Sequence, residues 1–197
     1  MVLAQPDVPV KNLPELFAYA KANPDKLAVA TDGARRFSGM VAAWLNKLAG
    51  TNIPYVPYTQ MTQGVQDVIA GRVQLIILNV PIAKGQIAAG KLRPLAVTSL
   101  NRLPEFPDVQ AVAETFPGFD FAGWFALAAP TGVPPAIIER VHNEVNAILR
   151  DPAVSGKLKT MSFVPYGGGT LKQTQDYIER QHAAWGTLVH EIGLQPE

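Results

Sequence analysis

Short apolar runs alternate with amphipathic helical segments along most of this sequence, and no other feature limits the fold as strongly. The apolar runs are rich in strand-forming residues, and turns containing glycine or proline separate them from the helical segments. Strands that alternate with helices predict an α/β fold with a parallel or mostly parallel sheet, whose ligands bind beyond the carboxyl ends of the strands. The predicted strands cover residues 27–31, 53–56, 73–78, 92–97, 119–129 and 163–165.

Local start and stop signals mark the predicted helices. Asn12 and Glu15 have the spacing of a capping box, and Thr170 and Gln173 repeat this pattern before the last helix. Gly50 is typical of a residue that ends a helix. The predicted helices cover residues 12–23, 38–50, 62–70, 81–89, 108–115, 135–150, 151–161 and 170–193.

The composition excludes several kinds of site and partner. The 17 Lys and Arg residues against 16 Asp and Glu give a net charge of +1, which provides no general attraction to nucleic acid or an anionic membrane. The absence of cysteine excludes disulfides, thiolate catalysis and sulfur-ligated zinc. Three histidines are few nitrogen ligands, so we expect no metal and no cofactor. Because the net charge is near zero, we also expect no nucleic-acid partner.

The segment 31–38 is the main candidate site, because it follows a predicted strand and opens a predicted helix. Amides at a helix N-terminus favour an anion, whereas arginines there oppose the helix dipole unless an anion or Asp32 compensates them. This pattern predicts an anion site, and the family resemblance given below implies that the partner is a small organic anion. The alternative is that these arginines are solvated and that one pairs with Asp32. The candidate residues are Thr31, Asp32, Gly33, Ala34, Arg35, Arg36, Phe37 and Ser38.

Three other features have plain structural alternatives. Gly167–Gly169 could hold a phosphate, but it lacks the lysine of a Walker loop, which favours a simple turn. Trp124 could line a cleft or pack in a core, and it is kept as a candidate ligand-binding residue. His142 has no Gly-x-Ser-x-Gly elbow to supply a nucleophile, so hydrolase chemistry of that class is unsupported.

A set of ordered motifs makes the sequence resemble one family from about Val8 to Leu194. The motifs include Val56-Pro57-Tyr58, Gly71-Arg72-Val73-Gln74-Leu75, residues 89–99, Gly123-Trp124-Phe125 and Asp151-Pro152-Ala153-Val154. In this order they resemble the Bug-type solute receptors of tripartite tricarboxylate transporters. The resemblance implies a type II periplasmic-binding-protein-like fold, in which two α/β lobes hold a small carboxylate in a cleft without changing it.

The resemblance also implies how the chain is divided. Residues 8–122 would form the complete second lobe, residues 125–197 the C-terminal part of the first lobe, and residues 123–124 the hinge region. The usual N-terminal part of the first lobe would then be missing. Tyr58 and Asn79 would join the loop in binding the ligand, and membrane transporter subunits would be partners.

This sequence departs from the family pattern at the loop, where Arg35, Arg36 and Phe37 replace glycine and serine. Leu78 stands where relatives often have an acidic residue, which weakens the case for an amino-acid ligand. The family resemblance implies a periplasmic location. Met1–Pro6 has no basic segment followed by a long apolar one, so a complete chain of this sequence would be cytoplasmic.

The leading functional hypothesis is therefore a solute-binding protein, or a truncated remnant of one, that takes a small carboxylate. The alternative is a cytoplasmic enzyme in which Arg35 and Arg36 hold a carboxylate and Asp32 acts as the base. A third reading is an interaction protein that binds no small ligand. The apolar stripe of helix 135–150 and the predicted strand around Trp124 favour a homodimer, in which C-terminal segments could be exchanged.

Overall fold

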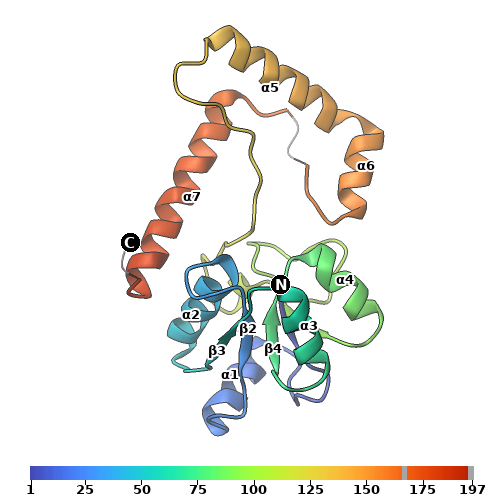
Figure 1. Cartoon of the computed structure of the whole chain (residues 1–197), viewed down its shortest axis with the longest axis vertical. Coiled ribbons are helices and arrows are strands. Elements are labelled where there is room, and N and C mark those ends of the chain that lie inside the picture. The colour runs from blue at the N-terminus through green and yellow to red at the C-terminus, as the bar shows by residue number, and fades with distance from the viewer. Residues whose placement is uncertain (166–167, 195–197) are drawn as a thin grey trace. The chain divides into compact units, whose positions relative to one another are not determined.

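The computed structural model describes residues 1–165 and 168–194 of the 197-residue chain. The chain forms two compact units. The first comprises Met1–Gly123 with the C-terminal stretch from Leu188, and the second comprises Trp124–Thr187. Figure 1 shows a sheet flanked by helices in the first unit, and helices joined by extended segments in the second.

The first unit is built on a five-stranded sheet in the order β3-β2-β4-β1-β5. β2 (Val29–Thr31) pairs in parallel with β3 (Tyr55–Pro57) and with β4 (Leu75–Ile77), as the sequence predicted. β1 (Val2–Ala4) lies between β4 and β5 (Arg93–Ala96) and runs antiparallel to both. The expectation of a mostly parallel sheet therefore fails at β1, which the sequence did not reveal as a strand.

β1 is short, and its identity as a strand depends on distant partners. Leu3 has no exposed surface, and the Met1 ammonium donates a hydrogen bond to the Leu78 carbonyl at 2.9 Å. Three residues are too few to show an alternating pattern, so the antiparallel place of β1 between β4 and β5 is not visible in the local sequence. Long-range pairing with β4 and β5 makes Val2–Ala4 a strand.

Helices cover both faces of the sheet (Figure 1). α1 (Leu13–Ala22) and α2 (Phe37–Ala49) pack on one face, where their apolar residues line a small hollow together with Val29. α3 (Met61–Ile69) and α4 (Val80–Ala88) contribute to the core cluster on the other face. These helices agree with the predicted ones to within a few residues.

The capping signals read from the sequence are confirmed at both ends of the chain. The Asn12 side chain accepts a hydrogen bond from the Glu15 amide at 2.9 Å, which begins α1. The Thr170 hydroxyl accepts from the Gln173 amide at 3.1 Å, and the Gln173 side chain accepts from the Thr170 amide at 2.8 Å. Gly50 ends α2 with φ +60°, in the left-handed region that favours glycine.

Three other predicted elements need correction. Residues 119–130 form neither helix nor strand, because a strand needs a continuous partner. In the described chain, a single backbone bond, from the Phe121 amide to the Thr98 carbonyl at 2.8 Å, joins this segment to the residues that follow β5. Residues 163–165 are likewise not a strand. The helix predicted at 108–115 is reduced to a 3-10 turn at Val112–Glu114.

The second unit consists of helices. α5 (Pro135–Arg150) contacts α6 (Pro152–Thr160), and the Asp151 side chain between them accepts from the Ala153 and Val154 amides. α7 (Leu171–Glu191) begins in this unit, and its end, where Leu188 is buried, belongs to the first unit. Among the described residues, no helix is both long enough and apolar enough to cross a membrane.

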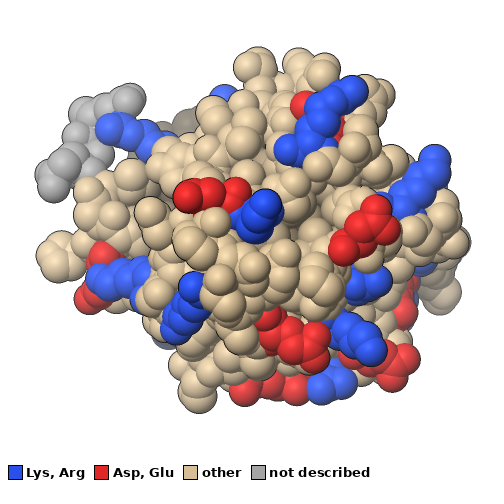
Figure 2. Space-filling model, turned by 90° about the horizontal axis from the view of Figure 1, so that it is seen from below, with Lys and Arg blue, Asp and Glu red and all other residues tan. Residues whose placement is uncertain are grey.

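Charged side chains are mixed on the surface. Figure 2 shows acidic and basic groups interspersed on one face of the molecule, with neither sign dominating it. This agrees with the near-zero net charge. Recognition of a charged ligand on such a surface depends on a local arrangement of groups.

Candidate functional site

The loop between β2 and α2 is closed by reciprocal bonds between Asp32 and Ser38. The Asp32 amide donates to the Ser38 hydroxyl oxygen at 2.8 Å. The Ser38 amide and hydroxyl both donate to Asp32 Oδ1, at 3.2 and 2.5 Å. Ser38 is buried at the start of α2, so these bonds fix the first turn of the helix against the end of β2.

Two glycines allow the loop to fold back on the helix. Gly33 has φ +124°, and its carbonyl accepts a hydrogen bond from the Arg36 amide at 3.1 Å. A Cβ atom on Gly39 would lie 2.0 Å from the Gly33 carbonyl oxygen, far inside van der Waals contact. The backbone of the loop therefore passes over Gly39 at a distance that only glycine permits.

The start of α2 is positively charged. Arg36 is the N-cap residue, its side chain makes no capping bond, and the first turn contains no acidic residue. Arg35 and Arg36 are both exposed. Because the helix dipole places positive partial charge at this end, the two arginines raise the local potential further, and Asp32 offsets part of it.

Thr31 supplies an unusual buried polar group. Among the residues that the structure describes, its Oγ1 atom is buried without a hydrogen-bond partner, and the residue has no exposed surface. Side chains alternate along a strand, so Thr31 faces the same side of the sheet as Val29, which is the side covered by α2. Thr31 thus places an unpaired hydroxyl beside the first turn of α2.

The backbone of Tyr58 is bonded to the loop, whereas its side-chain hydroxyl is bonded to Asp67. Its amide donates to the Thr31 carbonyl at 2.8 Å, and its hydroxyl donates to Asp67 at 2.8 Å. Burial, and then the bond to Asp67, raises the pKa of Tyr58. The pKa of Asp67 is lowered, first by the hydrogen bond from Tyr58 and then by that from Arg72. Tyr58 lies at the predicted site, but its hydroxyl already has an acceptor.

Asn79 stands at the same edge of the sheet as the loop. It is exposed, follows β4 and is the N-cap residue of α4, and its side chain makes no capping bond. β2, β3 and β4 are parallel neighbours, so α2, α3 and α4, which follow them, all begin at their carboxyl ends. The structure therefore brings Asn79, Tyr58 and the loop to one edge, as expected for an α/β sheet.

Trp124 belongs to the second unit. Its ring meets that of Tyr177 nearly edge-on, with 6.1 Å between centroids, and 40% of its surface is exposed. Phe125 is 87% exposed, although its ring contacts Phe163. The role of Trp124 in ligand binding stays a prediction.

The glycine-rich turn lies only partly in the described chain, because Gly167 falls outside it. The Gly168 amide donates to the Asn146 side-chain oxygen at 3.0 Å, and the Gly169 carbonyl lies 2.9 Å from His142 Nε2. These contacts tie the turn to α5, and the first of them uses the Gly168 amide, which is the kind of donor that a phosphate would need. In the described residues, no group of three or more acidic or histidine side chains has a metal-binding arrangement.

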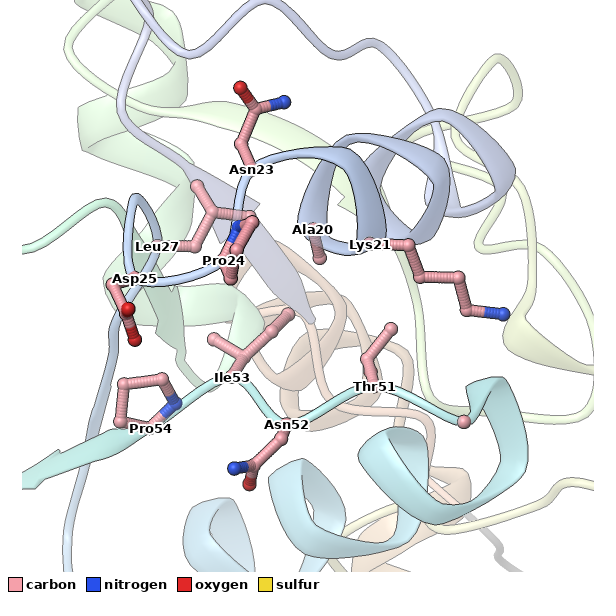
Figure 3. Close-up of a pocket in the computed structure, with 11 residues that line it drawn as sticks. Ala20, Lys21, Asn23, Pro24, Asp25, Leu27, Thr51, Asn52, Ile53 and Pro54 are labelled. Atoms are coloured by element: carbon pink, nitrogen blue, oxygen red, sulfur yellow. The ribbon is translucent and has the colours of Figure 1, made fainter.

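A surface hollow of about 340 Å³ lies at the other edge of the sheet. Figure 3 shows it between the end of α1, with Lys21 and Asn23, and the segment Thr51–Pro54. Leu27 and Pro54 in its wall precede β2 and β3, whereas the loop follows β2. The hollow is thus separated from the predicted site by the length of the strands.

Comparison with known families places this site in context. Residues 1–194 match the tripartite tricarboxylate transporter family receptor. The chain belongs to this receptor family. The resemblance read from the ordered motifs is thereby confirmed.

Two curated relatives of this receptor-family chain are longer than it is. It is 32% identical to a UPF0065 protein from the tcbD-tcbE intergenic region of Pseudomonas sp. strain P51, over 93% of this chain and 55% of the relative. It is 29% identical to protein BugT of Bordetella pertussis, over 99% of this chain and 60% of BugT. The chain thus spans little more than half the length of these relatives.

Solved structures of receptor-family relatives have the same fold. The R. palustris protein Rpa4515, solved with adipate, gives a TM-score of 0.86 at 29% identity, covering 100% of this chain and 66% of that protein. The periplasmic binding protein BugD gives 0.82 at 27% identity, with 100% and 66% covered. MatC of Rhodopseudomonas palustris, with bound malate, gives 0.77 at 25% identity, with 96% and 65% covered. The predicted periplasmic-binding-protein-like α/β fold is confirmed, and this chain contains part of it.

Proposed function

We propose that this receptor-family chain binds a small organic carboxylate at the loop 31–38. The positively charged start of α2 is the observation that carries the proposal, because Arg35, Arg36 and the helix dipole there all favour an anion. The buried unpaired hydroxyl of Thr31 beside this turn adds a further polar group. Asn79, at the same edge, supplies an exposed amide.

Relatives support the ligand class. One solved neighbour is described with adipate and another with bound malate, and both compounds carry carboxylates. By this analogy, the chain binds its solute without chemical change. The arginines at positions 35 and 36 suit a ligand with at least one exposed carboxylate, since guanidinium groups pair with carboxylates through two parallel hydrogen bonds.

The proposal includes a role in transport. A receptor of this family would work in the periplasm and deliver its solute to the membrane subunits of a tripartite tricarboxylate transporter. In this view, residues 8–122 form the second lobe, residues 125–197 are the C-terminal part of the first lobe, and residues 123–124 are the hinge. Trp124 remains among the residues that we propose for ligand binding.

We expect replacement of both loop arginines by alanine to weaken adipate binding about tenfold or more. Loss of one charge-assisted hydrogen bond costs roughly 1.5–3 kcal/mol, and about 1.4 kcal/mol corresponds to a tenfold change in affinity. Isothermal titration calorimetry on the wild-type chain and the Arg35→Ala/Arg36→Ala variant measures this change. Lys26→Ala/Lys91→Ala is the matched control, because it also removes two positive charges, and both lysines are exposed and precede β2 and β5, at the opposite end of the strands from the loop.

Two results would reject the proposed site. Unchanged adipate affinity in the double arginine variant would place the ligand elsewhere. An equal loss in Lys26→Ala/Lys91→Ala would show that overall charge, rather than the α2 N-terminus, governs binding.

We also propose that a second copy of the chain covers apolar surface of the second unit. Phe125, Leu127 and Val164 are 87%, 73% and 68% exposed, and Ile137 and Ile148 on α5 are more than half exposed. Apolar side chains that gather on one unit mark an interaction surface. A homodimer is the simplest assembly that buries the same surface on both copies.

The homodimer predicts a mass near twice 21.2 kDa in light scattering at micromolar concentration. Replacing Phe125 and Leu127 with serine should shift the mass toward that of a single chain, because the apolar contact is lost. A well-folded monomer of the wild-type chain, with a mass independent of concentration, would contradict the dimer.

A further inference from the structure

The place at the α2 N-terminus that suits a ligand carboxylate already holds a carboxylate of the protein. Asp32 Oδ1 accepts both the amide and the hydroxyl hydrogen of Ser38, the only serine or threonine in the first turn of α2. These are the kinds of donor that a helix N-terminus offers an external anion. A ligand at this turn must therefore displace Asp32 or lie beside it.

We infer that Asp32 is a specificity-determining residue, which opposes plain dicarboxylates and favours ligands that carry a hydroxyl group next to the carboxylate. This inference rests on the proposed function, because it concerns the same loop. With Arg35 and Arg36 positive and Asp32 negative, the loop has a formal charge of +1, and +2 without Asp32.

Repulsion between like charges explains why Asp32 disfavours plain dicarboxylates. A second carboxylate within a few ångströms of Asp32 meets electrostatic repulsion, since two carboxylates that share one site disfavour each other's ionised form. The half-exposed Asp32 can instead accept a hydrogen bond from a ligand hydroxyl. The hydrogen bond from its hydroxyl thus gives a hydroxy acid back part of the binding free energy that the repulsion costs.

The buried hydroxyl of Thr31 is an independent sign that this turn is built for polar contact. Its Oγ1 has no partner in the described chain, although the residue is fully buried and lies on the face covered by α2. Such a group costs free energy when it stays unpaired. A polar atom that enters the turn when Asp32 moves would provide the missing partner.

Malate and succinate test the inference, because they have the same carbon chain and differ in one hydroxyl group. We expect Asp32→Asn to strengthen succinate binding about tenfold, since the amide keeps the shape and loses the charge. Malate binding should improve threefold or less, because the hydrogen bond that the malate hydroxyl donates to the Asp32 carboxylate in the wild type becomes weaker when Asn replaces Asp32. Titration calorimetry of both acids gives these ratios.

Asp7→Asn is the matched control, because it removes one negative charge beyond the other end of the sheet, in the loop after β1. Strengthening of succinate binding by Asp7→Asn to the same extent would overturn the inference. Unchanged or weaker succinate binding in Asp32→Asn would also overturn it. The stability of Asp32→Asn is a second readout: a purely structural role lowers the urea midpoint and the affinity together, whereas our inference lowers the midpoint and raises the affinity.

The arginine variant separates this inference from the proposed function. If Arg35→Ala/Arg36→Ala weakens succinate binding and Asp32→Asn fails to strengthen it, the inference is wrong and the site stands. If the arginine variant binds succinate as the wild type does, the site and the inference both fail. Absence of binding of both acids to the wild type and to Asp32→Asn also rejects both.

Discussion

Gly39→Ala is expected to lower the free energy of unfolding by about 3 kcal/mol, at the upper end of what overpacking usually costs. The new Cβ atom would lie 2.0 Å from the Gly33 carbonyl oxygen and 2.9 Å from the Ala34 Cα atom. Both neighbours are backbone atoms, so no side-chain rotation relieves the clash and the loop itself must move. Urea unfolding monitored by circular dichroism measures the loss.

Gly85→Ala is the matched control for this prediction. Gly85 lies in α4 and a Cβ there would meet nothing within 4 Å, so alanine should stabilise the chain by roughly 0.4–1 kcal/mol through its helix propensity and the reduced freedom of the unfolded chain. Equal changes in the free energy of unfolding for Gly39→Ala and Gly85→Ala would contradict the close approach of the loop backbone to Gly39. Gly39→Ala should also weaken adipate binding, because it displaces the loop.

The helices could be predicted because their signals are local. Asn12 with Glu15, Gly50, and Thr170 with Gln173 each mark a helix end through bonds to residues at most four positions away. The parallel strands β2 to β4 were recognisable for a similar reason, since each is a short apolar run between turn residues. Local patterns therefore suffice for most of the secondary structure.

The strands that depend on distant pairing could not be placed in this way. β1 becomes a strand through the register Leu3 opposite Ile76, which no neighbouring residue encodes. Conversely, residues 119–129 have the composition of a strand, yet among the described residues a single backbone bond, from Phe121 to Thr98, joins them to the segment after β5. The difference is the presence of a partner strand, and sequence composition does not report it.

The candidate site was predictable as a place and not as a set of bonds. A loop between a strand and a helix, with two arginines, is visible in the sequence. The bonds of Asp32 to Ser38 require the loop to fold back over Gly39, and that path depends on backbone angles such as the positive φ of Gly33. For the same reason the sequence did not indicate that the Tyr58 hydroxyl would be bound to Asp67.

Arg93 is a further residue whose role appears only in the folded chain, and it carries the second large prediction. Its guanidinium donates to the carbonyls of Pro6, Val8 and Val10 at 2.8, 3.0 and 3.0 Å. These carbonyls belong to the loop between β1 and α1, so Arg93 at the start of β5 fixes that loop to the sheet. Arg93→Ala is expected to lower the free energy of unfolding by about 3 kcal/mol, because it removes charged hydrogen bonds and leaves carbonyl groups unpaired.

Arg93→Lys distinguishes charge from geometry in this role. Lysine keeps the positive charge but has one nitrogen in place of the planar fork, so it cannot reach all the carbonyls together and should recover less than half of the loss. Arg72→Ala provides the control for removal of an arginine, since its exposed pair with Asp67 is worth about 1 kcal/mol or less. Equal losses in Arg93→Ala and Arg72→Ala, measured by urea unfolding, would show that the loop between β1 and α1 is held without Arg93.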